Sequence, residues 1–80
     1  MSDGGGEAET WDAGQLGCGE LVVLLRMRLK RMPGQTLRVI AQDPGAEEDL
    51  PAWCRLTRNR LVRHDPATGS YWIQSKTDWT

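Results

Sequence analysis

The sequence predicts an α/β fold of the α+β kind: a two-layer sandwich with a four-stranded mixed β-sheet, two α-helices packed on one face, and the order βαβαββ. Apolar residues recur at helical spacing in two segments and alternate with polar residues in others. Eighty residues provide one small domain, and in so short a chain two amphipathic helices are both buried only against the same sheet. We therefore expect a disordered tail at 1–9, one domain at 10–76 and a frayed tail at 77–80.

The first helix is predicted over residues 20–32. A candidate short strand at 8–12, containing Trp11, and a glycine-rich turn at 14–19 precede it. Pro33 and Gly34 follow it, as is typical of a helix end. The residues at helical spacing on its predicted buried side are Leu21, Leu24, Leu25, Leu29 and Met32, and Val22 and Val23 widen that side toward full burial near the helix start.

The second half of the domain begins with a strand predicted over 36–41, where apolar and polar residues alternate. A second helix is expected over 49–58, with Asp49 as a cap and a looser turn before it, because Pro51 is awkward in a helix interior. Its predicted buried side consists of Leu50, Trp53, Cys54 and Leu56. Strands at 60–65 and 70–75 flank a turn at 66–69 and form a hairpin.

The charge is unevenly distributed along the chain. The formal net charge is −1, but four of the eleven acidic residues precede Ala13. The remainder holds ten Lys and Arg against seven Asp and Glu, a surplus of three positive charges. So small a surplus suits an acidic protein partner. It argues against direct nucleic-acid binding, which requires a strongly basic face.

The first residues and the apolar runs of the chain indicate the cellular compartment in which the protein is expected. The first seven residues are acidic and glycine-rich, unlike a secretion signal. No apolar run approaches the roughly 18 residues of a membrane span. With only two cysteines, a disulfide framework is not expected. We therefore expect a cytoplasmic protein without a membrane segment, and a monomer.

Cys18 is the sharpest candidate for chemistry. The glycine-rich turn delivers it to the first turn of a helix, where unpaired N–H groups and about half a positive charge gather. A thiol held there is partly stabilised as the nucleophilic thiolate, although the negative charge of Glu20 works against that form. The alternative is a small buried apolar residue, as free cysteine often is.

The remaining candidates are more ordinary. Cys54 is expected either to pack in the core or to act as a second thiol that resolves an oxidised Cys18. His64, the only histidine, is expected to be a solvated surface residue. Because these three residues are scattered along the chain, no metal site is predicted. The glycines of the turn form no dinucleotide fingerprint, so no cofactor is predicted either.

Three segments of the chain form a recognisable pattern. They are Asp12-Ala13 followed by Leu16-Gly17-Cys18; Met32-Pro33-Gly34-Gln35-Thr36-Leu37; and Asp43-Pro44-Gly45-Ala46 followed by Asp49-Leu50-Pro51-Ala52-Trp53-Cys54. Through these segments the chain, from Trp11 to Lys76, resembles the TusA/SirA-type sulfur-carrier family of small bacterial and archaeal proteins. The family's fold is a two-layer sandwich, in agreement with the fold predicted above.

The resemblance implies a role for Cys18. In the family, the cysteine at the start of the first helix carries sulfur as a persulfide. It receives the sulfur from a cysteine desulfurase or another sulfurtransferase and passes it to a downstream protein. Carried over to this chain, Cys18 would bear the sulfur and act as a carrier rather than as an enzyme. The supporting loop would comprise Gly17, Gly19 and Glu20, and the partner contacts would comprise Leu16, Leu21 and Arg26.

The chain departs from the family at its hallmark Cys-Pro-x-Pro, which reads Cys18-Gly19-Glu20-Leu21 here. Proline early in a helix presets the backbone, whereas glycine loosens it. Three functions therefore remain open. They are a sulfur carrier, a non-catalytic interaction or regulatory module on the same fold that has lost sulfur transfer, and a thiol redox sensor that uses Cys18 and Cys54.

Overall fold

The computed structural model describes residues 8–79 and, for Cys18, the backbone only. Its elements are β1 (Glu9–Gly14), α1 (Cys18–Lys30), β2 (Thr36–Ala41), α2 (Ala46–Thr57), β3 (Arg60–Asp65) and β4 (Ser70–Gln74). The predicted order βαβαββ is confirmed. Neither helix is long and apolar enough to cross a membrane in the part of the chain described.

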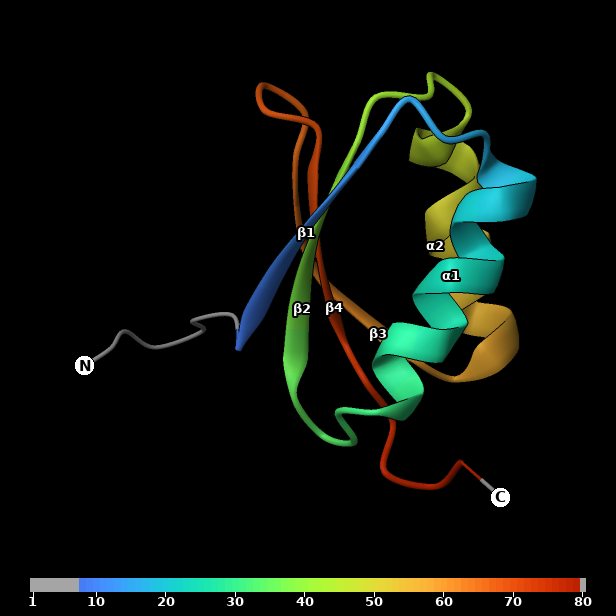
Figure 1. Cartoon of the computed structure of the whole chain (residues 1–80), viewed down its shortest axis with the longest axis vertical. Coiled ribbons are helices and arrows are strands. Elements are labelled where there is room, and N and C mark those ends of the chain that lie inside the picture. The colour runs from blue at the N-terminus through green and yellow to red at the C-terminus, as the bar shows by residue number, and fades with distance from the viewer. Residues whose placement is uncertain (1–7, 80) are drawn as a thin grey trace.

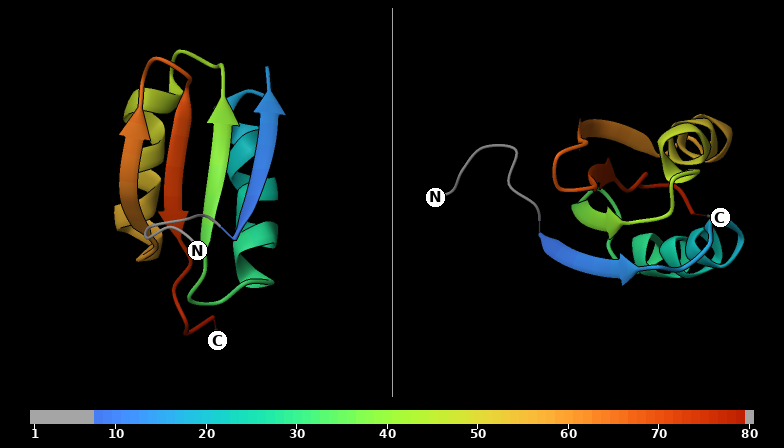
Figure 2. Two further views of the ribbon diagram at one scale, coloured as in Figure 1. Left: turned by 90° about the vertical axis from the view of Figure 1, so that its left-hand side faces the viewer. Right: turned by 90° about the horizontal axis from the view of Figure 1, so that it is seen from above.

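The four strands form one mixed sheet in the order β1-β2-β4-β3. Strands β1 and β2 are parallel, and α1 supplies the crossover connection that parallel strands need. Strand β4 is antiparallel to both of its neighbours. Both helices lie on one face of the sheet, and the opposite face carries no helix in the described part of the chain (Figures 1 and 2). The predicted two-layer sandwich is therefore confirmed.

The core lies between the sheet and the two helices. Helix α1 contributes Leu21, Leu25 and Leu29, which are wholly buried because they recur on one side of the helix. In β2 the buried residues alternate with half-buried ones, as predicted. The other core residues are Ala13, Met32, Leu37, Val39, Ala41, Ala46, Leu50, Cys54, Tyr71 and Ile73.

Strand β3 contains a bulge that changes which side chains face the helices. Its pairing with β4 shifts between Leu61 and Arg63, so Val62 is an extra residue and is 49 % exposed. Arg63 is therefore paired with Trp72 on the uncovered face of the sheet, while His64 is paired with Tyr71 on the helix side.

Helix α1 begins at Cys18, two residues before the predicted start. The predicted burial of Val23 is wrong, because its side chain is 58 % exposed. Two residues along a helix turn the side chain through roughly 200°, so Val23 points away from the sheet that covers Leu21. At the start of α1 only the side of the helix that faces the sheet is buried, because no further layer covers the opposite side in the described part of the chain (Figure 1).

Helix α2 begins at Ala46, three residues before the predicted start, so Asp49 lies inside the helix rather than at its cap. Pro51 lies inside this helix, where it lacks the N–H that would bond the carbonyl of Glu47. The predicted burial of Leu56 is also wrong, since its side chain is 83 % exposed, on the opposite side of the helix from Cys54.

The ordered part of the chain is longer at both ends than predicted. Residues 1–7 of the predicted disordered tail lie outside the described residues, but the Ala8 N–H donates to the Thr36 carbonyl at 2.8 Å. The prediction of a frayed tail is wrong at Trp79, which packs against the core. The Trp79 indole Nε1–H donates to the Ser75 hydroxyl at 2.9 Å.

Candidate functional site

The connection between β1 and α1 is short and anchored. Gly14 adopts a φ of 61°, a left-handed conformation that favours glycine. Its N–H donates to the Asp12 carboxylate at 2.8 Å, and its carbonyl accepts from the Gln42 N–H at 3.0 Å. The second bond ties this connection to the loop that follows β2. The turn therefore spans only Gln15 to Gly17 before the helix begins, and it brings Cys18 to the same end of the molecule as the β2–α2 loop (Figure 1).

The start of α1 is built as an uncapped helix end. Gly17 occupies the N-cap position with φ −68° and ψ 156°, and it has no side chain to bond the first-turn amides. The Leu21 N–H donates to the Gly17 carbonyl at 2.8 Å, the first hydrogen bond of the helix. The N–H groups before Leu21 have no partner within the helix. Together with the helix dipole, they favour an anion at the position where Cys18 enters the helix.

The structure sorts the predicted neighbours of Cys18 by exposure. Gly17, Gly19 and Glu20 are exposed at the helix start. Leu16 is half-buried and packs against the core. The prediction that Leu21 contacts a partner is wrong, because Leu21 is wholly buried. It is the first core residue of α1 and anchors the helix start on the sheet.

Arg26 lies two turns further along α1, about 12 Å from the helix start, and is exposed. It lines a cavity of about 430 Å³ between the two helices and the C-terminal segment, where Leu56, Lys76 and Trp79 also lie. The neighbouring Arg28 is engaged elsewhere. Its guanidinium lies 3.1 Å from the Glu9 carboxylate of β1.

Cys54, the second cysteine of the chain, lies in the core. Its side chain is 2 % exposed in α2. Burial raises the pKa of the Cys54 thiol from 9.0 to about 11, against a smaller opposing effect of Arg55. A thiol of this kind is protonated at neutral pH and is a poor nucleophile. Core packing therefore describes Cys54 better than a role as a resolving thiol.

A disulfide between the two cysteines also conflicts with the helix arrangement. Helices α1 and α2 start at the same end of the molecule and run side by side (Figure 1). Cys18 is the first residue of α1 and Cys54 the ninth of α2, so Cys54 lies roughly 12 Å along its helix from that end. Disulfide Cα atoms are usually separated by 4.4–6.8 Å. The arrangement therefore argues against the redox-sensor function.

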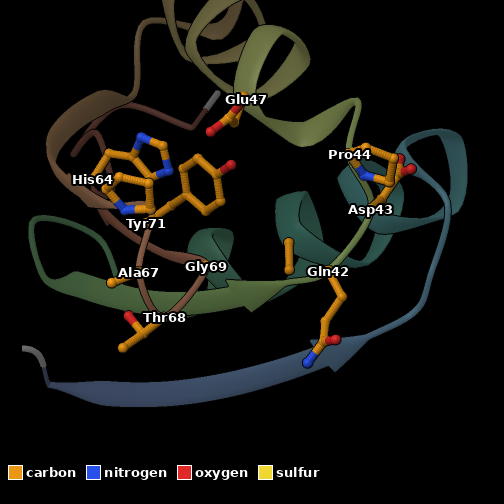
Figure 3. A pocket seen from close by; sticks show the side chains of 11 residues that line it. Gln42, Asp43, Pro44, Glu47, His64, Ala67, Thr68, Gly69 and Tyr71 are labelled. Atoms are coloured by element: carbon orange, nitrogen blue, oxygen red, sulfur yellow. The ribbon is translucent and has the colours of Figure 1, made fainter.

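A cavity of about 460 Å³ lies beside the β2–α2 loop and was not anticipated from the sequence. Figure 3 shows His64 and Tyr71 on one side of it, Asp43 and Pro44 on the other, and Glu47 reaching in from α2. It opens at the end of the molecule where α1 begins.

His64 is not the solvated surface residue that the sequence suggested. Its ring is half-buried and stacks on Tyr71 with centroids 4.2 Å apart and planes 9° from parallel. Its Nε2 is buried and has no hydrogen-bond partner among residues 8–79 as described. The hairpin offered a signal for this contact, since counting outward from the turn at 66–69 pairs residue 64 with residue 71.

A family model described as Sulfurtransferase TusA matches residues 9–75 of the chain. The chain belongs to the TusA family. It is 37 % identical over 70 residues to the sulfur carrier protein TusA of Pseudomonas paraeruginosa, covering 84 % of this chain and 89 % of the relative. The same named protein of Pseudomonas syringae pv. syringae is 37 % identical over 70 residues, covering 84 % and 83 %. That of Pseudomonas putida is 36 % identical over 70 residues, covering 84 % and 88 %.

Membership of the TusA family confirms the resemblance on which the sequence analysis drew. The matched segment runs from the first residue of β1 to the residue after β4, so it covers the whole sheet and both helices. Cys18 lies inside it, at the position where the family resemblance expects the sulfur-bearing residue.

Proposed function

We propose that this protein is a sulfur carrier that accepts sulfur as a persulfide on Cys18 and relays it to a partner protein. The observation that carries the proposal is the backbone position of Cys18. It is the first residue of α1, directly after the uncapped Gly17, in a chain whose relatives are named sulfur carrier proteins.

The chemistry is two successive sulfur transfers. The Cys18 thiolate attacks the terminal sulfur of a donor persulfide, a new S–S bond forms on Cys18, and the donor leaves as its thiolate. An acceptor thiolate then attacks the terminal sulfur on Cys18, which returns to the thiolate. Neither step needs an external oxidant or reductant, because one S–S bond forms as another breaks. The partners required are a donor, such as a cysteine desulfurase, and an acceptor protein.

The start of α1 supports this chemistry through its backbone. The first-turn N–H groups and the helix dipole stabilise the anionic thiolate and persulfide, by charge-assisted hydrogen bonds. Gly19 retains an N–H group that proline at that position would lack. Neither Gly17 nor Gly19 obstructs access, since a side-chain carbon at either position would meet nothing within 4 Å. The segment proposed to support the persulfide is therefore the N-cap residue Gly17 and the first-turn residues Gly19 and Glu20, which the sequence predicted as a loop.

Docking of a protein partner would use the exposed side of α1 beyond its first turn. Val23 is 58 % exposed and Met27 is 48 % exposed, and Arg26 lies between them in the chain. An apolar surface with a cation suits a partner that combines apolar and acidic side chains. We infer that Arg26 is a partner contact and that Leu16 borders the sulfur at the helix start.

The test is the intact mass of the reduced protein after incubation with a cysteine desulfurase and cysteine. A gain of one sulfur atom is expected in the wild type and in Cys54→Ser, and none in Cys18→Ser. Cys54→Ser is the matched control because it removes the other thiol of the chain. A small-molecule persulfide donor replaces the desulfurase in a second series, to remove dependence on protein docking.

The alternative is a non-catalytic interaction or regulatory module that has kept the fold and lost sulfur transfer. The absence of both hallmark prolines favours this module. The positions that hold proline in the family are here an exposed glycine, Gly19, and a buried core residue, Leu21. Absence of added sulfur with both donors would support the module and refute the carrier. In that case Cys18→Ser should leave partner binding unchanged.

A further inference from the structure

The uncovered face of the sheet carries a tryptophan flanked by two arginines. Trp72 of β4 lies opposite Arg38 of β2 and Arg63 of β3 in one row across the sheet. The guanidinium carbon of Arg38 lies 5.1 Å from the centre of the Trp72 ring, and that of Arg63 lies 4.6 Å from it. This is the face turned toward the viewer in the left panel of Figure 2. The indole is only 8 % exposed although no helix covers it.

The Arg38 guanidinium is held in place by a hydrogen bond to the neighbouring strand β4. Its Nε–H donates to the hydroxyl of Ser70 at 3.0 Å, and Ser70 is wholly buried. The Ser70 hydroxyl also bonds the Thr68 hydroxyl at 2.8 Å. Because Nε makes this bond, the two terminal nitrogens of Arg38 remain as donors for a ligand. A guanidinium fixed in this way has lost part of its rotamer freedom before a ligand binds.

The positive charges of this row are not neutralised within the described residues. Neither Arg38 nor Arg63 forms an ion pair there. Asp12 and Asp65, the acids of the next row on the same face, are engaged in turns. Asp12 accepts from the Gly14 N–H, and Asp65 accepts from a backbone N–H and a hydroxyl of the 66–69 turn. A third cation, Arg60, pairs with Gln74 and so lies in the row on the other side of the arginines from these acids.

The geometry selects among anionic ligands. A nucleic acid binds a sheet face mainly by stacking bases on exposed aromatic rings, but the Trp72 ring is already covered by guanidinium groups. A long polyanion along the strands would meet Asp12 and Asp65 roughly 7 Å from the arginine row. A short segment with two or three carboxylates fits the row, since guanidinium groups bind carboxylates through paired hydrogen bonds.

We propose that the uncovered sheet face is a docking site for a short acidic segment of a partner protein, with Arg38 and Arg63 as its anchors. The site is independent of Cys18, which belongs to the helix layer on the other side of the sheet (Figure 1). A protein bound at the sheet face would leave the start of α1 accessible to a second protein.

The experiment uses the full ¹⁵N-labelled chain and an acetylated, amidated octapeptide of alternating glutamate and threonine. We expect amide shifts in β2, β3 and β4 and a shift of the Trp72 indole N–H. The matched peptide of glutamine and threonine should cause none. In Arg38→Gln/Arg63→Gln the dissociation constant should rise by about tenfold or more, because two charge-assisted contacts are lost. The control Arg55→Gln, which changes an exposed arginine of α2 on the helix side, should bind as the wild type does.

Four results would overturn the proposal. The first is peptide binding that the double variant retains. The second is a set of shifts confined to α1 and α2. The third is tighter binding of an oligothymidylate of equal charge, which would make the face a nucleic-acid site. The fourth is a shift of the Trp72 indole N–H, without peptide, when Asp3 and Glu7 are neutralised by Asp3→Asn/Glu7→Gln, which would make the chain's own first residues the occupant.

Discussion

The two prolines that this chain lacks should have opposite effects when they are introduced one at a time. The family hallmark places them at positions 19 and 21. In this chain position 19 is exposed and position 21 is wholly buried. We therefore expect Gly19→Pro to stabilise the fold and Leu21→Pro to destabilise it, although both belong to the same motif.

The magnitudes follow from the contacts of each residue. At position 19 the first helical turn offers no internal partner for the lost N–H, and an added side-chain carbon meets nothing within 4 Å. The smaller entropy of the unfolded chain should then raise the free energy of unfolding by about 0.4–1 kcal/mol. At position 21 the substitution removes the 2.8 Å bond to the Gly17 carbonyl and the buried side chain. Together these losses should cost about 2–4 kcal/mol.

The assay is urea unfolding followed by tryptophan fluorescence, with Leu21→Ala as the control that keeps the N–H and loses the side chain. Leu21→Pro should be less stable than Leu21→Ala or equal to it. Equal stability of Leu21→Pro and the wild type would refute the assignment of Leu21 to the core. Destabilisation by Gly19→Pro of more than about 1 kcal/mol would show that the Gly19 N–H has a structural partner.

Four further substitutions or conditions test other contacts. Gly69→Ala should lower the free energy of unfolding by at least about 1–2 kcal/mol. Gly69 has a φ of 69°, and an added carbon would lie 2.9 Å from the Ala41 carbonyl oxygen. Gly17→Ala, with open space around position 17, is the near-neutral control in the same urea titration. Ser75→Ala should cost about 1–3 kcal/mol, because the hydroxyl donates to the Leu29 carbonyl at 2.6 Å and accepts from Trp79; an unchanged unfolding curve and tryptophan emission would contradict this. Burial raises the pKa of the Cys54 thiol from 9.0 to about 11 in the folded protein. The stability that this shift contributes is fully present below pH 9 and is lost as the pH rises through 11. Unfolding at a series of pH values should show this loss in the wild type and not in Cys54→Ala. Mild oxidation should leave Cys18 and Cys54 unlinked in mass mapping without reductant, and a disulfide found there would revive the redox-sensor function.

The sequence predicted the fold well because its signals were local and repeated. The leucines of α1 and the alternation of β2 each fix a buried side, and proline and glycine residues mark the element ends. The errors concern residues whose burial depends on the layer arrangement. Val23 and Leu56 are apolar and helical, and only the single layer beneath the helices leaves them exposed. Helical spacing was the unused signal, since each lies two residues, or roughly 200° around the helix, from a buried residue, Leu21 or Cys54.

The candidate site was predictable in part. The position of Cys18 at a helix start follows from the glycines and the helix pattern, and the structure places it at the first residue of α1. The burial of Leu21 was predicted from its helical spacing, whereas its assignment as a partner contact, made from its place near the cysteine, was wrong. The arginine row on the sheet was missed, since Arg38, Arg63 and Trp72 come together only through strand pairing.

The bulge in β3 gives a single residue control over the chemistry of two surfaces. If the strand kept Val62 but paired without the bulge, with Leu61 still opposite Ile73, Arg63 would move to the helix side and His64 to the outer face. The cation would then point toward the apolar core, and the imidazole would leave Tyr71. Deleting Val62 itself would keep both side chains on their present faces, because the remaining residues already pair one to one. Homologues of equal length that lack the bulge would present different outer faces on an unchanged fold.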